Sequence, residues 1–473
     1  MIIAKKIFEF YYYFYTVYSI SIFAFYIFLT VISLKAMIHY FKRNSFINYQ
    51  HLYSSELAPS VSILAPMFNE EENAVAAIKS LLNLHYVNYD IIVINDGSTD
   101  ATSQKIIEFF EMESINKNVY PKIPFKKVNN VYKSKNKFYE KILFIDKENG
   151  GKSDSLNAGL NFSNSDYVLC IDGDCILMHD ALIKMVKPVL DSTETVIASG
   201  GVVRVANDCI FKNGNLIEIN LSNKFLVKTQ ILEYIRSFLL ARMAWSKLKG
   251  LMVVSGAFGI LNRKIAIDVG GYLTNTIGED MEIIVRMQRY MYKKKKKFIL
   301  QYIPDPLCWT EAPENLKILY RQRKRWTIGN IQTLVKHRKM NLNRKYKLTG
   351  LFSFPFWIIY ERWGPIIEIS GIVFFICASF LGYVNWIYTI SFFIATYLFS
   401  IMYSFFSILC EEITFNQYKK KYDILKLLST AIIEPITYHI FLLFPTLMGN
   451  IDILLKRKIG WGKMERKGLE RTN

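Results

Sequence analysis

The sequence predicts an α/β domain enclosed between apolar helices that cross a membrane. Between about residues 60 and 347, short apolar runs alternate with helical patterns, as in a doubly wound, largely parallel sheet. Residues 10–34 form an apolar and aromatic stretch, which is long enough to cross a bilayer core of about 30 Å. Residues 366–381 and 386–409 have the same character, so the α/β part is expected to lie between membrane spans.

The chain is therefore expected to have three parts. Residues 1–45 hold an N-terminal transmembrane helix and its flank, and residues 46–347 hold a cytosolic α/β domain. Residues 348–473 hold interfacial helices, the C-terminal transmembrane helices and a basic tail. Lys42 and Arg43 follow the first span, and the positive-inside rule places the residues after it in the cytosol.

The C-terminal part leaves the number of spans open. Residues 351–363 mix aromatic side chains with charged ones, which suits a helix lying at the membrane surface. Residues 425–448 are apolar but contain Pro435, so they form either a fourth span or a bent interfacial helix. The tail, with Lys463 and Arg466, is expected on the cytosolic side, and this requires an even number of C-terminal spans.

The composition narrows the kinds of partner. The chain of 473 residues has a formal net charge of +19, and 51% of its residues are hydrophobic. Such a basic balance suggests nucleic acid, anionic lipid or phosphorylated substrates. No helix-turn-helix or zinc-finger pattern is present, so no nucleic-acid partner is expected, and a membrane-tethered nucleic-acid binder is a distant alternative. The six cysteines form no C-x-x-C pair, which predicts reduced thiols and no zinc site.

Two acidic residues end the apolar run of residues 167–171. Asp172 and Asp174 are separated only by Gly173, at a position where a parallel strand presents groups to ligands at its carboxyl end. Buried carboxylates are costly unless a cation holds them, and a divalent metal that carries a phosphate would do so. The pattern therefore predicts a metal–nucleotide site, although a solvated Asp-Gly-Asp turn has the same sequence.

Other strand ends are expected to contribute to the same edge of the sheet. Asp96 follows the apolar residues 91–94, and Lys152 follows Gly150 and Gly151 at the start of a helical pattern. Backbone N–H groups and one lysine at a helix N-terminus can hold a phosphate. The spacing differs from that of a P-loop and from G-x-G-x-x-G, so ATPase and dinucleotide-binding functions are not predicted. The alternative is a glycine turn with a surface lysine.

The second half of the domain adds a candidate general base. Ser255 and Gly256 belong to a loop of small residues, where a ligand can approach the backbone closely. Glu279 and Asp280 head a helical pattern that runs to Tyr292. Helix capping and the helix dipole explain acidic residues there equally well, and the functional interpretation is a general base.

Two basic segments follow. The five lysines of residues 293–297 are expected to form a solvated or lipid-facing edge. Gln322 and Arg325 lie three residues apart in a helical stretch, with Trp326 beside them, and this spacing puts the first two on one face. Arginine offers a planar fork for phosphate, and an indole ring offers a stacking surface for a sugar. The alternative is another basic helix at the membrane surface.

Five motifs in this order resemble those of the processive, membrane-embedded family 2 glycosyltransferases, which include the synthases of cellulose, hyaluronan and poly-beta-1,6-N-acetylglucosamine. The resemblance extends from about residue 61 to residue 326, and residues 149–152 are most similar to the poly-N-acetylglucosamine branch. It implies that residues 46–347 form a GT-A (Rossmann-like) catalytic domain inserted between transmembrane helices. The motifs are Asn95-Asp96-Gly97-Ser98, Gly150-Gly151-Lys152 with Asn157-Ala158-Gly159, Asp172-Gly173-Asp174, Gly278-Glu279-Asp280 and Gln322-Arg323-Lys324-Arg325-Trp326.

The resemblance implies a role for each residue on the donor side. Asp96 would bind the uracil of a UDP-sugar, with Lys152 nearby. Asp172 would contact the ribose and diphosphate. Asp174 would ligate the Mg²⁺ or Mn²⁺ that bridges the diphosphate.

On the acceptor side, the resemblance implies that Asp280 deprotonates the acceptor hydroxyl group. Burial near Glu279 is expected to raise the pKa of Asp280 and so make it a suitable base. The diphosphate would be held by Gln322, Arg325 and Trp326. The terminal sugar of the acceptor would be held by Trp326, Ser255 and Gly256.

The implied enzyme is an inverting, metal-dependent hexosyltransferase of a bacterial-type plasma membrane. It would extend a β-linked polysaccharide from a UDP-sugar, with UDP-N-acetylglucosamine as the expected donor, and export the product. A non-processive enzyme that makes a glycolipid is the alternative, since such relatives share most of the donor motifs.

Two positions depart from the family pattern. Gly173 stands where alanine is usual and Gly278 where threonine is common, and both changes are expected to have little consequence. With few spans, a complete polymer channel is expected to need an accessory subunit or a second copy of the chain.

Overall fold

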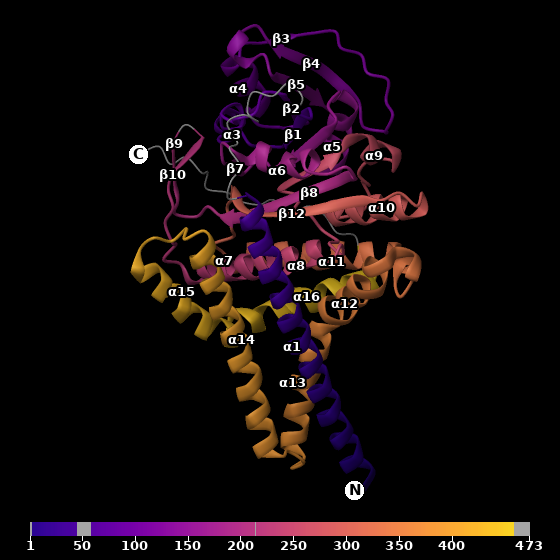
Figure 1. Cartoon of the computed structure of the whole chain (residues 1–473), viewed down its shortest axis with the longest axis vertical. Helices are drawn as coiled ribbons and strands as arrows, with labels where there is room; N and C mark the ends of the chain where they lie inside the picture. Colours follow the sequence, from indigo (N-terminus) through magenta and orange to yellow (C-terminus); the bar gives the residue numbers. More distant parts are fainter. Residues whose placement is uncertain (1, 45–57, 213, 458–473) are drawn as a thin grey trace.

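The computed structural model describes residues 2–44, 58–212 and 214–457. The expected boundary between the first helix and the domain, at residues 45 and 46, lies outside these ranges, as does the tail with Lys463 and Arg466. An α/β domain occupies one end of the described molecule, and long helices extend from it at the other end (Figure 1).

The domain is built on a ten-stranded mixed sheet with the order β3-β4-β5-β2-β1-β6-β11-β8-β12-β7. Four parallel strands lie side by side within it: β5 (Ile142–Lys147), β2 (Tyr89–Asp96), β1 (Val61–Met67) and β6 (Tyr167–Ile171). Their side chains are apolar and buried almost without interruption, because helices cover both faces of such a sheet. The predicted α/β fold is confirmed.

Helices connect these parallel strands in the right order for a doubly wound sheet: α3 (Ala74–Leu82), α4 (Thr102–Phe109) and α5 (Lys152–Phe162). Helix α5 is buried along nearly its whole length. Its polar residues are therefore bonded inside the protein, and Asn157 Nδ2 donates to the carbonyl oxygen of Tyr272 at 2.8 Å. This bond joins α5 to the second half of the domain.

One segment of the sheet was not predicted. Residues 116–140 were expected to form a surface loop or hairpin, and β4 (Val128–Ser134) lies within them and pairs with both β5 and β3 (Met112–Ser114). Residues 128–134 thus form one arm of an antiparallel hairpin with β5, in line with the hairpin alternative. Most side chains of β4 are polar and only Val131 is buried, so a strand near the edge of the sheet carries no apolar run that would reveal it.

The other half of the sheet is mixed. Its strands are β7 (Cys175–Leu177), β8 (Thr195–Val205), β11 (Phe258–Asn262) and β12 (Phe298–Thr310). Strand β11 lies antiparallel between β6 and β8, and β12 runs parallel to β8. Helix α10 (Glu279–Lys293) packs beside this half. The expected basic edge follows it, and all five lysines of residues 293–297 are exposed.

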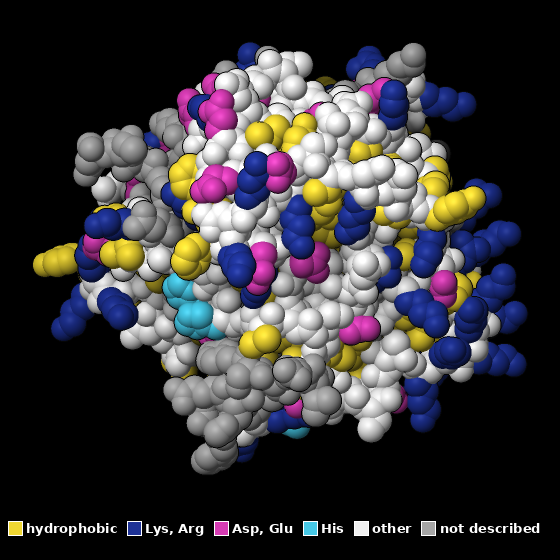
Figure 2. Space-filling view, turned by 90° about the horizontal axis from the view of Figure 1, so that it is seen from above, with side chains coloured by type: hydrophobic (Ala, Val, Ile, Leu, Met, Phe, Trp, Pro, Cys, Tyr) yellow, Lys and Arg dark blue, Asp and Glu magenta, His cyan; other side chains and the backbone are white. Residues whose placement is uncertain are grey.

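Dark blue side chains project mainly along one margin of the face that points away from the long helices (Figure 2). Elsewhere on that face, basic and acidic side chains alternate in small groups. The high net charge is thus not gathered into one basic groove on this face.

A layer of helices separates the sheet from the long helices (Figure 1). It consists of α7 (Phe225–Tyr234), η2 (Ile235–Ala241), α8 (Arg242–Lys247), α11 (Leu316–Lys336) and α16 (Tyr438–Leu454). Helix α16 runs along α11, where Lys324 of α11 forms an ion pair with Asp452 of α16.

Within the described residues, three helices are long and apolar enough to cross a membrane, and a bent pair would make a fourth if counted as one span. The three are Phe8–Asn44, Thr349–Phe380 and Trp386–Thr414. In Figure 1 the first lies within α1 (Ile2–Asn44), the second ends in α13 (Gly364–Phe380) and the third is α14 (Trp386–Thr414). Their side chains are mostly unburied in the protein, as expected for helices that face lipid. The chain has the helices of an integral membrane protein.

Two predictions about the C-terminal part need refinement. Residues 351–363, expected to be a separate interfacial helix, continue directly into the second candidate span, Thr349–Phe380. The segment left open as a span or a bent helix is a pair of helices, Lys421–Ile436 and Tyr438–Leu454, bent by 49°. The second helix of the pair is α16, which crosses the direction of α14 beneath α11 (Figure 1).

Buried ion pairs join the domain to the C-terminal helices. Arg204 of β8 pairs with Glu411 of α14, and each side chain is only 4% exposed. Arg236 of η2 donates to both carboxylate oxygens of Glu434 at 2.9 Å. Buried pairs of this kind are costly to break, because the remaining charge stays desolvated.

We expect Arg204→Met to lower the free energy of unfolding by about 3–5 kcal/mol, because it leaves the carboxylate of Glu411 buried without a counter-charge. The matched control is Glu113→Gln, which removes a pair with Lys135 in which both side chains are 59% exposed and should cost at most about 1 kcal/mol. Denaturant unfolding of the purified, detergent-solubilised protein measures both. Equal losses of unfolding free energy in the two variants would show that the buried pair stabilises the protein no more than the exposed one.

Candidate active site

A cavity of about 1400 Å³ lies at the carboxyl ends of the parallel strands. It extends from Asp96 and Asp172 at the sheet to Trp357 and Glu361 in the first part of the candidate span Thr349–Phe380. All the predicted site residues line this one cavity: Asp96, Lys152, Asp172, Asp174, Ser255, Gly256, Glu279, Asp280, Gln322, Arg325 and Trp326. Parallel strands end at one edge of a sheet, and ligands commonly bind there.

The carboxylate of Asp96 organises the loop before α5. Its Oδ1 accepts bonds from Lys147 Nζ at 2.7 Å, from Gly150 N at 2.9 Å and from Ser155 Oγ at 2.8 Å. Its Oδ2 accepts from Gly151 N at 2.7 Å. A carboxylate offers about four lone-pair sites, so this one is used by the chain itself. Any contact with a nucleotide base has to share oxygens that already hold the glycine loop.

Lys147 was not predicted as a site residue. Its side chain is 0% exposed, and Nζ lies 2.7 Å from both Asp96 Oδ1 and Asp154 Oδ1. A lysine directly after an apolar strand is a weak signal, because many exposed strands end in the same way. The charge is nevertheless central, since it compensates two buried carboxylates beneath the loop.

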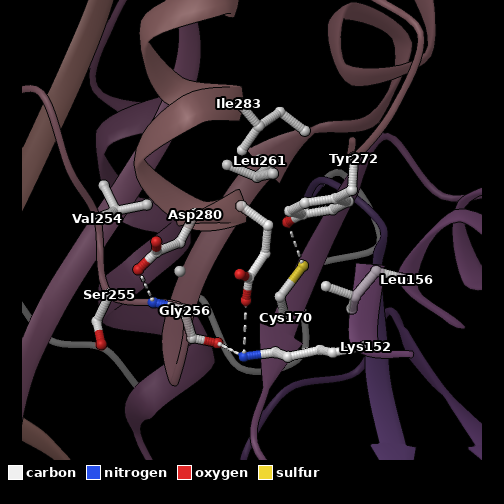
Figure 3. A pocket seen from close by; sticks show the side chains of 12 residues that line it. Lys152, Leu156, Cys170, Val254, Ser255, Gly256, Leu261, Tyr272, Asp280 and Ile283 are labelled. Carbon is white, nitrogen blue, oxygen red and sulfur yellow. Dashed lines mark hydrogen bonds and ion pairs between the residues drawn. The ribbon is translucent and has the colours of Figure 1, made fainter. Parts of the chain in front are cut away.

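Lys152 joins four segments of the chain around the cavity, and Figure 3 shows its bond to Gly256. Its Nζ forms an ion pair with Asp172, lies 3.5 Å from Glu279 Oε1 and donates to the carbonyl oxygen of Gly256 at 3.3 Å. Burial alone would lower the pKa of Lys152, but the carboxylates of Asp172 and Glu279 raise it above its usual value. The ammonium group is therefore charged at any physiological pH.

The two acids of the predicted base differ in environment. Asp280 Oδ2 accepts from the Gly256 N–H at 3.1 Å, and Oδ1 accepts from the Met281 N–H at 2.8 Å. Glu279 is 6% exposed, and burial raises the pKa of Glu279 to about 7, with Lys152 opposing the rise and Asp280 adding to it. Among the acids that line this end of the cavity, Glu279 is the one whose pKa burial raises.

Asp172 and Asp174 offer oxygen ligands at the edge of the sheet. The side chain of Asp172 is 32% exposed, and both residues line the cavity. Among the described residues, no group of three or more His, Cys, Asp and Glu side chains converges as a metal site. Carboxylate oxygens suit Mg²⁺ and Mn²⁺, so these two residues fit an ion whose remaining ligands come from a diphosphate and water.

The two departures from the family pattern have different consequences. A Cβ atom at Gly173 would lie 3.7 Å from the nearest atoms, which is an ordinary contact, so alanine would fit there. A Cβ atom at Gly278 would lie 2.8 Å from the Cα atom of Gly329, where no side chain fits. The expectation of little consequence is therefore wrong for Gly278.

The basic helix is α11. Gln322 and Arg325 both line the cavity, as their spacing predicts, and Trp326 is 41% exposed beside them. Arg323 is buried beside the cavity, and it donates to Glu233 Oε2 at 2.7 Å. Its guanidinium group also lies 4.0 Å from the centre of the Trp326 ring, which steadies the indole at the cavity wall.

The far end of the cavity contains residues that were not predicted. They are Glu233, Arg242, Trp357 and Glu361. For Glu361 a signal existed, because a charged residue in an otherwise apolar membrane-proximal stretch is a functional candidate. Glu233 and Arg242 lie in an ordinary amphipathic helical stretch, where nothing in the local pattern distinguishes them.

We expect Lys147→Met to destabilise the protein by about 3–5 kcal/mol, because it leaves the carboxylates of Asp96 and Asp154 buried without their cation. The additional change Asp154→Asn should restore part of the loss. Lys133→Met, on the exposed face of β4, is the control and should change stability by less than about 0.5 kcal/mol. Denaturant unfolding gives the free energy of unfolding of the natural protein and of the three variants. If Lys147→Met left this free energy unchanged, the structural role of Lys147 would be contradicted.

The raised pKa of Glu279 predicts a pH dependence of stability. Between its usual value near 4.5 and about 7, the folded protein keeps a proton that the unfolded chain has released. The free energy of unfolding therefore falls as pH rises through this window, by up to about 1.4 kcal/mol per pH unit from this group. Glu279→Gln should remove that contribution, so unfolding curves of both proteins at pH 5, 6, 7 and 8 test it. Parallel pH profiles would refute it.

The chain has recognisable relatives among curated proteins. Two poly-beta-1,6-N-acetyl-D-glucosamine synthases of Staphylococcus epidermidis are 27% identical to it over 277 and 315 residues. These matches cover 58% and 66% of this chain and 56% and 65% of the relatives. A protein of the same name from Staphylococcus aureus is 26% identical over 277 residues, or 58% of this chain and 56% of that one. The chain thus spans less than two thirds of the length of these relatives.

Solved structures give weaker likenesses. The mannosyltransferase PcManGT from Pyrobaculum calidifontis, in complex with GDP-Man and Mn2+, aligns with a TM-score of 0.49 and 14% identity, over 92% of this chain and 99% of that one. Residues 1–349 of S. aureus TarS, in complex with UDP-GlcNAc, align with a TM-score of 0.34 and 13% identity, over 57% of this chain and 66% of that one.

Family profiles decide the assignment. The profile described as Glycosyl transferase family 2 matches residues 62–269, and that of Glycosyl transferase family group 2 matches residues 167–410. The two matches together cover every strand of the sheet and helix α11. Since the second match alone spans more than half of the chain, the chain belongs to the family 2 glycosyltransferases.

Proposed function

We propose that this glycosyltransferase extends a β-linked polysaccharide from a UDP-sugar with inversion at the anomeric carbon, and that the donor is UDP-N-acetylglucosamine. One observation carries the proposal: a single cavity is lined by all the predicted site residues and continues from the edge of the sheet to the candidate span Thr349–Phe380. The names of the Staphylococcus relatives support N-acetylglucosamine as the transferred sugar.

The donor would lie along the carboxyl ends of β2 and β6. Asp96 and the glycine loop would hold the nucleoside end, and Asp172 the ribose and diphosphate. Asp174, with Asp172, would hold Mg²⁺ or Mn²⁺, which when bound stabilises the negative charge on the departing diphosphate. Arg325, which lines the same cavity, would add positive charge at the leaving group.

Asp280 would act as the base. It takes the proton from the acceptor hydroxyl group while that oxygen attacks the anomeric carbon from the face opposite the diphosphate. The bond from the anomeric carbon to the diphosphate oxygen breaks, and UDP leaves with the electron pair, so the configuration inverts and no covalent intermediate with the enzyme forms. The N–H of Gly256 bonds Asp280 Oδ2, which orients the carboxylate for the transfer.

The acceptor would occupy the part of the cavity nearer the helical layer. The exposed ring of Trp326 offers a stacking surface for the terminal sugar, and Ser255 and Gly256 would align its hydroxyl group. The cavity continues to Trp357, which leaves room for an extended chain.

We also propose where each part of the chain lies in the cell. Residues 46–347 would form the cytosolic catalytic domain, and residues 1–45 and 348–473 would hold it in the plasma membrane of a bacterium. Export of the product would need an accessory subunit or a second copy of the chain to complete a channel, because the described residues offer only three long apolar helices and one bent pair.

One observation favours a second candidate, a non-processive enzyme that makes a glycolipid. The cavity reaches Trp357 and Glu361, and both belong to the candidate membrane span Thr349–Phe380. An acceptor head group anchored in the bilayer could therefore enter the cavity from its membrane end.

We expect purified protein to release UDP from UDP-N-acetylglucosamine in the presence of Mn²⁺ or Mg²⁺, and to lose at least about 100-fold of this rate in Asp280→Asn, since general-base catalysis is worth about 10²–10⁴. A panel of other UDP-sugars identifies the donor. Asp268→Asn is the matched control, because this exposed aspartate lies outside the cavity.

The products decide between the two candidates. A ladder of long chains on a sizing gel supports polysaccharide extension, and a single lipid-linked sugar supports the glycolipid enzyme. Full activity of Asp280→Asn would remove this residue as the base, and activity that persists in excess EDTA would overturn the metal requirement.

A further inference from the structure

The turn that carries the proposed base is fixed to helix α11. The turn consists of residues 276–280, directly before and at the start of α10. Contacts at three levels connect this region to the second half of α11, which lies beyond the motif residues Gln322, Arg325 and Trp326. No step of the proposed reaction uses this second half.

The first contact is between two backbones. Gly278 of the turn lies against Gly329 of α11, so a Cβ atom on Gly278 would come within 2.8 Å of Gly329 Cα, and a Cβ atom on Gly329 within 2.7 Å of Gly278 Cα. Contacts this short exclude any side chain at either position. The two segments thus pack backbone against backbone, with no space for a side chain between them.

The second contact is a side chain that reaches back from α11. Gln332 Oε1 accepts from the backbone N–H of Ile277 at 2.9 Å and from the hydroxyl group of Thr276 at 3.1 Å. One oxygen thus bonds two successive residues of the turn. Thr276 is buried, so both donors would lack a partner if this oxygen were removed.

The third contact lies one helical turn further on. Glu282 is 0% exposed, and its Oε1 lies 3.1 Å from Nε2 of His337 at the end of α11. Arg286 completes the pair with Glu282 at 2.7 Å. Together the three contacts make the start of α10 and the body of α11 one unit.

We propose that Gln332 is a positioning residue for the proposed base, and that it sets the place of Asp280 through Ile277 and the Gly278–Gly329 contact. Its amide oxygen holds the N–H of a residue three positions before Asp280. This bond ties the start of α10, which carries Asp280, to α11, which carries Arg325 and Trp326. The proposed base, the arginine at the leaving group and the tryptophan that stacks on the acceptor therefore keep a fixed geometry. The inference rests on the proposed function.

The expected effect is on the chemical step and not on donor binding. Apart from Arg325, the residues proposed to bind the donor are Asp96 of β2, Asp172 directly after β6 and Lys152 of α5, whereas the side-chain bonds of Gln332 go to Thr276 and Ile277. A displacement of about 1 Å in a catalytic group can cost about 100-fold in rate. Gln332→Met removes the acceptor oxygen at similar size, and we expect kcat to fall about 10- to 100-fold while KM for the UDP-sugar stays within about twofold.

Two matched variants accompany it. Gln332→Glu keeps an oxygen that accepts both bonds and should retain activity within about threefold of the natural protein. Thr333→Val changes the next residue of the same helix. Thr333 is buried, and its hydroxyl group donates only to the carbonyl oxygen of Gly329 within the helix. The kcat and KM of this variant should equal those of the natural protein. Calorimetric binding of UDP to each protein reports that the donor site is intact.

A double-mutant cycle separates positioning from general stability. In an Asp280→Asn background the base is absent, so adding Gln332→Met should lower the residual rate less than about twofold. A further 10-fold or greater loss would show that Gln332 acts independently of Asp280 and would overturn the inference. Loss of UDP binding in Gln332→Met would overturn it too, because the residue would then be a general structural support.

The cycle also distinguishes the inference from the proposed function. If Asp280→Asn is fully active, the proposed base is wrong, and the inference falls with it. If Asp280→Asn is inactive while Gln332→Met has the natural kcat, only the inference fails. Should Gln332→Met yield no folded protein, Thr276→Val, which removes one donor to Gln332 Oε1, takes its place in the cycle, with a loss of kcat that should again largely disappear in the Asp280→Asn background.

Discussion

The structure around the cavity depends on one cation, the ammonium group of Lys152. Four segments that are far apart in the sequence meet at it: the glycine loop before α5, the end of β6 at Asp172, the loop at Gly256 and the start of α10 at Glu279. The carboxyl groups of Asp172, Glu279 and Asp280 all lie close to this ammonium group. Without the cation, repulsion between ionised carboxylates would drive the segments apart. Beneath the loop, Lys147 plays the same part for Asp96 and Asp154. The site is thus assembled by buried charge compensation as much as by the sheet.

The helical layer gives this site its second boundary. Helix α11 carries cavity-lining residues on one face and buries Arg323 on another, where Glu233 and Tyr438 bind it. Helix α16 supports α11 from the membrane side through the pair of Lys324 with Asp452. The cavity wall is therefore shared between the sheet and helices that pack on the membrane-proximal part of the chain. The cavity therefore borders both the edge of the sheet and the candidate span Thr349–Phe380 in one continuous space.

Much of the fold could be predicted because buried parallel strands are continuous apolar runs. β1, β2, β5 and β6 were recognisable for this reason, and the acidic residues that follow them were placed at one edge by topology alone. Strand β4 was not recognisable, because its polar residues resemble a loop. Lys147 and Gln332 were equally hidden, since their partners are remote in sequence and a lysine or glutamine carries no signal by itself. The importance of Gly278 was missed because it comes from Gly329, 51 positions later, and only the packing of α10 on α11 reveals it.

The contact between those two glycines also limits how this sequence can change over time. A side chain at either position collides with the backbone of the other segment, so neither residue can mutate first without moving a helix. A threonine at position 278 would become acceptable only after α11 had shifted outward, and such a shift would carry Arg325 and Trp326 with it. Homologues with threonine at this position are therefore expected to hold the helix at a greater distance. The pair of glycines thus ties any change in the turn before α10 to a change in the place of α11.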